Sequence, residues 1–132
     1  MRRITAVFLA MAALVVGAVA QDWYHDREER FRGEGWRAKV FLHVKTDLEH
    51  VWSVNHAADQ ERKRIERTKD ELTKMQADLD QGRWDNGLLN DCIDSLQKSS
   101  NDQRLAPRDR DVLADDVKRL KDYQEHHNQW PH

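Results

Sequence analysis

The architecture of this chain is set by residues Ile65 to Gly82, IERTKDELTKMQADLDQG. Apolar or near-apolar positions recur there at steps of three, four, three and four residues: Ile65, Thr68, Leu72, Met75 and Leu79. This heptad spacing predicts an α-helix with one apolar stripe turned toward other helices. Gly82 follows the last of these positions, where a left-handed glycine ends many helices. Since the other faces are almost entirely charged, the helix needs partner helices, and we expect an all-α fold.

Three further segments carry helical spacing of apolar residues and are separated by short turns. The sequence predicts helices over residues 36–54, 59–81, 87–99 and 107–127. Pro107 suits the first turn of the last helix, because proline lacks the N–H group that would be unpaired there. Four helices with short turns predict an antiparallel up-down helical bundle. A bundle of three helices, in which the first two segments are fused through Ala57 and Ala58, is the alternative.

The first twenty residues have the pattern of a secretory signal peptide. It has a basic start at residues 2–3, an apolar run at residues 4–16 and a small-x-small cleavage pattern at residues 18–20. A membrane anchor is the alternative, but the apolar run is shorter than the roughly 20 residues that a spanning helix needs. We therefore expect cleavage before Gln21, no membrane span after it, and a product in the bacterial periplasm or outside the cell.

The rest of the chain divides into three parts. Residues 21–35 are a charged lead-in without clean periodicity, which we expect to be partly disordered with a helical turn or two. The bundle domain covers residues 36–127, and residues 128–132 form a frayed tail. Without Arg2 and Arg3, the 22 basic residues become 20 against 24 acidic ones, so the net charge is about −4. This near balance argues against a nucleic acid partner.

Cys92 is the only cysteine, so the chain has no internal disulfide. It falls between Leu89 and Ile93 on the apolar face of the third helix, where a buried thiol acts as a small hydrophobe. An intermolecular disulfide or a reactive thiol is the other interpretation.

The sharpest chemical candidate is a metal site on the first helix. His43, Asp47 and His50 lie at i, i+4 and i+7, and two imidazoles with a carboxylate suit Zn²⁺ or a related ion. The helix rise separates His43 from His50 by roughly 10 Å, so one ion takes Asp47 with only one of them. Asp47 also lies in the apolar arc, where an ion pair from another helix is the favoured role because a lone buried charge is costly. A polar rim on an amphipathic helix is the plainer interpretation.

No motif for catalysis or cofactor binding is present. The sequence has no Ser-His-Asp signature, glycine-rich phosphate loop, paired-cysteine site or haem attachment motif, so we expect neither an enzyme nor a cofactor. Trp52, Trp84 and Trp130 are candidate contacts for an unknown protein partner or a second copy of the chain. For Trp52 and Trp84, covering the end of the bundle is the favoured role, and partner contact is the alternative.

The sequence resembles two groups of proteins. Leu72-Thr73-Lys74-Met75-Gln76 spells L-T-x-x-Q, which resembles the motif of the Spy and CpxP group of periplasmic stress chaperones and adaptors. In that group the leucine and threonine open a helix, whereas here Thr73 falls in the middle of one. Residues 47–51, 67–72 and 107–113 are similar to uncharacterised small exported bacterial helical proteins. The resemblances imply export, helical structure and, from the first, a chaperone or adaptor role, but no site residues.

Taken together, the sequence predicts a non-enzymatic, exported helical-bundle protein that acts through protein–protein interaction. A metal-binding or metal-buffering periplasmic protein and a periplasmic stress chaperone or adaptor are the alternatives. The three roles need different surfaces, so the arrangement of the helices bears on the choice.

Overall fold

The computed structural model describes residues 22–55 and 59–128. Within these ranges the chain is helical, with turns and loops but no β-strand, which confirms the predicted all-α class. Chain contacts divide the described residues into two compact units, which separate after Trp36. None of the described helices is long and apolar enough to cross a membrane. The predicted signal peptide, residues 1–20, and Trp130 lie outside the described residues.

In the first unit, the described residues start with a helix over residues 22–30. The Arg27 guanidinium lies 4.8 Å from the centroid of the Phe31 ring, one turn further along. The chain then bends at Gly33, which has a φ of 69°, and the Trp36 indole N–H donates to the Gly33 carbonyl at 3.0 Å. The sequence predicted only a turn or two of helix here. The helix is longer because local contacts of this kind stabilise it without producing an apolar period.

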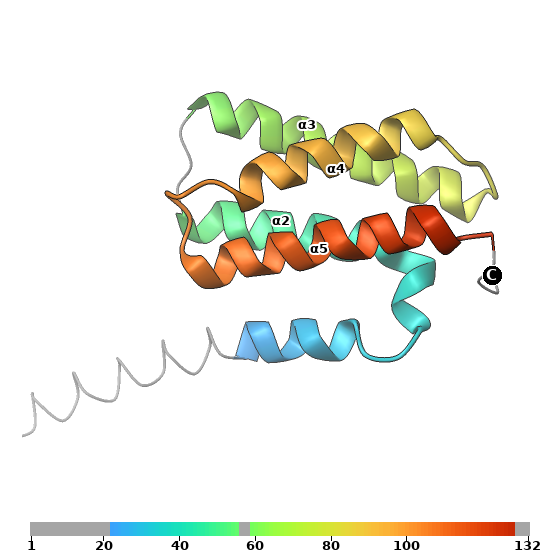
Figure 1. Cartoon of the computed structure of the whole chain (residues 1–132), viewed down its shortest axis with the longest axis horizontal. Helices are drawn as coiled ribbons and strands as arrows, with labels where there is room; N and C mark the ends of the chain where they lie inside the picture. The colour runs from blue at the N-terminus through green and yellow to red at the C-terminus, as the bar shows by residue number, and fades with distance from the viewer. Residues whose placement is uncertain (1–21, 56–58, 129–132) are drawn as a thin grey trace, which may run out of the picture. The chain divides into compact units, whose positions relative to one another are not determined.

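The second unit contains four long helices (Figure 1). A short 3-10 helix, η1 (Gly35–Lys39), precedes α2 (Val40–Asn55), α3 (Asp59–Asp80), α4 (Asn86–Ser100) and α5 (Pro107–His126). Each of the four predicted segments forms one of these helices, with shifted ends. The largest difference lies at the start of the first, where the tighter η1 replaces the first turn of α-helix.

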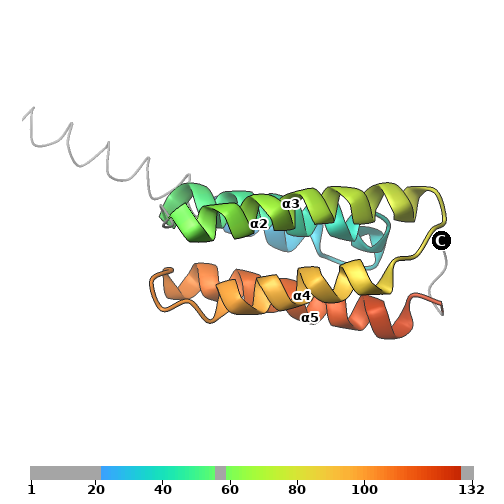
Figure 2. The ribbon, with the colours of Figure 1, turned by 90° about the horizontal axis from the view of Figure 1, so that it is seen from above.

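The long helices pack as two antiparallel hairpins, α2 with α3 and α4 with α5 (Figure 2). The two hairpins form two layers, and α3 also packs against α4 while α2 packs against α5. Because α2 and α3 lie side by side, the alternative in which they fuse into one helix is wrong. Gly82 ends α3 with a φ of 73°, a conformation that glycine adopts without strain, as its position in the sequence predicted.

The core of the second unit comes from the predicted stripes. On α3, Leu72 and Met75 are almost completely buried, and so is Thr68, whose hydroxyl donates to the Arg64 carbonyl at 2.8 Å. This bond explains why a threonine is tolerated inside the core. The other helices contribute Val40, Phe41, Val44, Leu48, Val51, Leu89, Ile93, Leu96, Leu113, Val117 and Leu120.

Gln76 fixes the position of α3 against the start of α2. Its side chain is buried, and its amide nitrogen donates to the Ala38 carbonyl and to Asp80 Oδ1, both at 2.9 Å. Its amide oxygen accepts the backbone N–H of Leu42 at 3.4 Å. A single side chain therefore connects the backbone of η1, the first turn of α2 and the end of α3.

Replacing Gln76 with alanine should destabilise the protein by about 1–3 kcal/mol, because part-buried backbone groups of Ala38 and Leu42 lose their partner. Gln97→Ala on α4 is the matched control, since the half-buried Gln97 side chain forms no hydrogen bond. The control should change the free energy of unfolding by less than about 0.5 kcal/mol. Urea unfolding followed by circular dichroism measures both variants, and equal losses would contradict the role given to Gln76.

Candidate functional site

The predicted metal ligands on α2 have different surroundings. Asp47 is completely buried, His43 is half-buried, and His50 Nε2 lies 4.0 Å from Oδ1 of the buried Asp109 on α5. Across residues 22–55 and 59–128, no group of three or more His, Cys, Asp or Glu side chains is arranged to hold a metal ion. A metal on Asp47 with one of the two histidines stays a prediction. Asp109 was not predicted as a neighbour of His50, because no local pattern connects α2 with α5.

A stack of aromatic rings forms around Trp84, in the turn between α3 and α4. The Trp84 ring lies over the His127 imidazole, with centroids 3.6 Å apart and planes 12° apart. It also stacks on the buried Tyr123, at 5.8 Å and 24°, and Tyr123 meets Phe41 edge to face at 5.6 Å. This arrangement, from here on the Trp84 stack, connects the turn to α5 and α2.

The Trp84 side chain stays partly open to solvent despite these contacts. It is 36% exposed and, with Leu42 at 38%, it is one of two exposed large hydrophobic residues in the part of the chain that the structure describes. Burial raises the pKa of the Tyr123 hydroxyl, whose ring stacks on the indole. Trp84 thus stacks on the buried Tyr123, as its favoured covering role requires, while part of the ring stays exposed, and contact with a partner stays a prediction.

Trp52 lies in a more enclosed place. It is half-buried, and the Arg62 guanidinium lies 5.9 Å from the centroid of its ring. With Leu48 and Leu105 among others, it lines a cavity of about 10 Å³. These surroundings support the covering role for Trp52 over a role as a partner contact.

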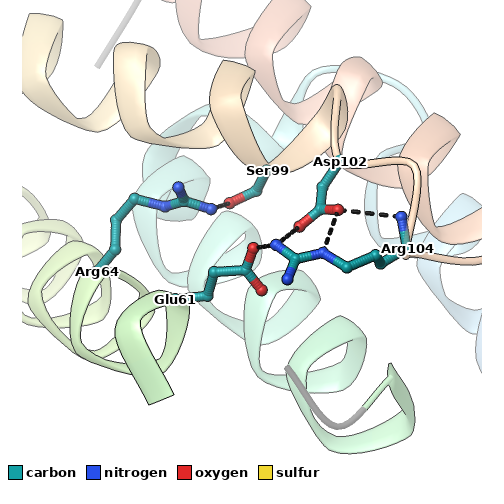
Figure 3. Close-up of polar contacts among 5 residues, drawn as sticks. All are labelled: Glu61, Arg64, Ser99, Asp102 and Arg104. Carbon is teal, nitrogen blue, oxygen red and sulfur yellow. Dashed lines mark hydrogen bonds and ion pairs between the residues drawn. The ribbon is translucent and has the colours of Figure 1, made fainter. Parts of the chain in front are cut away.

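A cluster of polar contacts ties α3 to the loop between α4 and α5 (Figure 3). The Arg104 guanidinium binds Asp102 through two bonds of 3.0 Å and forms an ion pair with Glu61 near the start of α3. Asp102 also accepts the Arg104 backbone N–H at 3.0 Å, and Arg64 Nη2 donates to Ser99 Oγ at 3.2 Å. Glu61, Asp102 and Arg104 are paired with one another, so we assign their contacts a structural role.

Polar pairs continue from this cluster along the interface of α3 and α4, which we call the polar seam. Its pairs are Arg64 with Ser99 at 3.2 Å, Thr68 with Ser95 at 2.5 Å, and Glu71 with Cys92 at 3.8 Å. From one pair to the next, the residue number rises along α3 (64, 68, 71) and falls along α4 (99, 95, 92). This is the pattern expected of two antiparallel helices in a constant register. The sequence did not predict the seam, because the heptad spacing of α3 describes only its apolar positions.

Cys92 is fully buried within the seam, and its thiol donates to Glu71 Oε2. Burial and then the neighbouring Glu71 charge raise the pKa of Cys92 to about 12. Burial and then repulsion from Asp91 raise the pKa of Glu71, while Arg67, with Nε 3.7 Å from Glu71 Oε1, opposes this rise. The thiol therefore stays protonated, which supports the interpretation of Cys92 as a small hydrophobe rather than a reactive group.

In the folded protein at pH 8, Cys92 should react with Ellman's reagent at least about 100-fold more slowly than in the urea-unfolded chain. The reaction is slow because only a small fraction of the thiol is present as the reactive thiolate, and because the buried sulfur is not accessible to the reagent. The rate of absorbance increase, followed across a urea series, measures this. Rapid labelling in buffer, with the helical circular dichroism intact, would contradict the burial of Cys92.

Glu71→Gln should stabilise the protein at pH 7 and lose this advantage at low pH. A raised folded pKa means that the folded state binds this proton more tightly than the unfolded chain. The free energy of unfolding therefore falls as the pH rises from 4.5, the ordinary pKa of the group, through the raised pKa of Glu71 in the folded state. At still higher pH the protein remains less stable by this amount. Urea midpoints at pH 7 and near pH 4 test this, with Glu66→Gln, at an exposed position of α3, as the control. An equal gain at both pH values would refute the titration of Glu71.

Comparison of the chain with family models, curated proteins and solved structures found no match. The candidate sites therefore depend on the chain's own residues. Of the arrangements described above, only the Trp84 stack includes an exposed large hydrophobic side chain.

Proposed function

We propose that this chain is an exported, non-enzymatic protein-binding module, an up-down bundle of four helices behind a cleaved signal peptide. Export to the periplasm or beyond rests on the signal-peptide pattern of residues 1–20. The binding role rests on one observation, which is that Trp84 is exposed and yet held flat against His127 and Tyr123. Tryptophan is among the residues most enriched at the energetic centres of protein interfaces.

The backbone on both sides of Trp84 supports this role. Gly82 ends α3, and the Asp85 carboxylate accepts the Leu88 N–H at 3.0 Å, so Asp85 caps the start of α4. The turn is thus fixed at both ends and its indole is fixed by stacking. A side chain that is already ordered loses little conformational entropy on binding, which favours affinity.

The residues on both sides of Trp84 in the sequence, Arg83 and Asp85, are charged and would form a polar rim. Arg83 lies beside it in the sequence and pairs with Asp78 at 3.5 Å, while Lys74 approaches Asp85 at 4.0 Å. An apolar centre with a charged rim is the usual arrangement of a transient protein interface. The partner surface that fits is an apolar pocket bordered by charges of both signs.

The chaperone or adaptor role implied by the L-T-x-x-Q string is a narrower version of this proposal. Within that string, Leu72 is buried and Gln76 is bonded to Ala38 and Asp80, so neither faces a client. Thr73 accepts a bond from Lys45 at 2.8 Å. The string thus has structural roles here, and the Trp84 stack remains the better candidate for partner contact.

A photo-crosslinking residue placed at position 84 should capture a defined protein in the producing cell, whereas one at Lys118, an exposed site on α5, should not. Mass spectrometry of the adducts identifies the partner or shows a second copy of the chain. Once the partner is purified, Trp84→Ala should weaken binding by about 30-fold or more, as expected for a hot-spot tryptophan.

His127→Ala is a second variant for the same assay, because it leaves the indole in place and removes the ring that holds it flat. It should weaken binding less than Trp84→Ala does. Circular dichroism and the urea midpoint establish that both variants fold. A folded Trp84→Ala protein with unchanged affinity for the captured partner would refute the proposed surface.

A further inference from the structure

A charged groove runs along the polar seam between α3 and α4. It encloses about 340 Å³ and is lined only by polar and charged residues: Arg64, Arg67, Glu71, Asp91, Asp94, Ser95 and Lys98. This volume is near the lower end of the range of about 300–1,000 Å³ that is typical of small-molecule sites. The groove does not include Trp84, so it is independent of the proposed partner surface.

Two cations share one end of the groove. Arg64 Nη2 donates to Ser99 Oγ, and Lys98 is the residue before Ser99, so the Arg64 and Lys98 side chains line the groove at the same level. Neither cation forms an ion pair with a described carboxylate. The Nε atom of Arg64 is buried without a hydrogen-bond acceptor. This end therefore has positive charge and an unused donor.

Two carboxylates share the other end. Cys92 donates to Glu71, and Asp91 is the residue before Cys92, so Glu71 and Asp91 lie close enough to repel each other. Arg67 approaches Glu71 at 3.7 Å, but Asp91 forms no ion pair with a described cation. Like charges that face each other cost free energy, and a ligand of opposite charge would remove this cost.

We propose that this groove binds a short zwitterionic peptide in an extended conformation, with its carboxylate at Arg64 and Lys98 and its ammonium at Glu71 and Asp91. Arg64 and Glu71 are seven residues apart on α3, which is about 10 Å at a rise of 1.5 Å per residue. An extended chain covers about 3.3–3.6 Å per residue, so a peptide of about three residues spans this distance. The two charges of a single amino acid are too close together to reach both ends.

The middle of the groove fits the backbone of such a peptide. Arg67 and Asp94 supply a donor and an acceptor between the charged ends, where the peptide amides would lie. Because the groove is open to solvent, each charge contact contributes at most about 1 kcal/mol. We therefore expect a dissociation constant on the order of 1 mM.

Titration of trialanine into the ¹⁵N-labelled chain, followed by NMR, tests the proposal. Trialanine should shift the amide resonances of residues 64–71 and 91–98. N-acetyl-trialanine and trialanine amide, which each lack one charge, should bind about two- to fivefold more weakly. The doubly blocked peptide should bind about 4- to 25-fold more weakly than trialanine, because both charge contributions are lost.

Charge-removing variants assign the two ends of the groove. Lys98→Gln and Asp91→Asn should each weaken trialanine binding about two- to fivefold. Asp91→Asn should leave the binding of N-acetyl-trialanine unchanged, because that peptide has no ammonium group. Lys118→Gln and Asp111→Asn, which make the same charge changes at exposed positions of α5, are the matched controls and should have no effect.

Three results would overturn the proposal. The first is the absence of shifts at tens of millimolar trialanine, and the second is equally tight binding of the doubly blocked peptide. The third is a set of shifts confined to the Glu71 and Asp91 end that Ca²⁺ alone reproduces, since this would assign the carboxylates to a divalent cation.

Discussion

Burial of the apolar stripe of α3 is the interaction on which the rest of the structure depends. The other faces of this helix are charged, and isolated helices are marginal in water, so α3 is stable only when Leu72 and Met75 are covered. Both are almost completely buried, and each such side chain contributes about 1.5–3 kcal/mol. Helices α2 and α4 both pack against α3. The stripe therefore requires the two-hairpin arrangement, and that arrangement places the turn with Trp84 at one end of the bundle (Figure 1).

The surfaces proposed for function lie where the packing of the apolar core places the fewest constraints on the side chains. The seam between α3 and α4 is made of polar pairs such as Thr68 with Ser95, so charged residues can line a groove beside it without disturbing the apolar packing. The turn that holds Trp84 exposes one large aromatic ring. Trp84, Asp91 and Lys98, which are replaced in the binding tests, are all exposed, which is why these substitutions are expected to leave the fold intact.

The elements of the fold were predictable because their signals are local. The apolar period of α3, Gly82 after it and Pro107 at the start of α5 each act within a few residues, and the observed helices agree with these signals. The sites were less predictable, because they join distant segments. The proximity of His50 to Asp109 and the stacking of Trp84 on His127 depend on how α5 packs against the other helices. The spacing of residues within one helix gives no information about this packing. The helix over residues 22–30 was underestimated, since it has no apolar period.

Rigid presentation of Trp84 is the central claim of this account, and the order parameter of its indole N–H tests it most directly. ¹⁵N relaxation of the labelled chain gives this value, with the resonance assigned by its loss in Trp84→Phe. The account predicts an order parameter of about 0.8 or more, close to that of rigid backbone. A value below about 0.6 would mean that the indole moves freely, and it would contradict the stack on which the proposed interface depends.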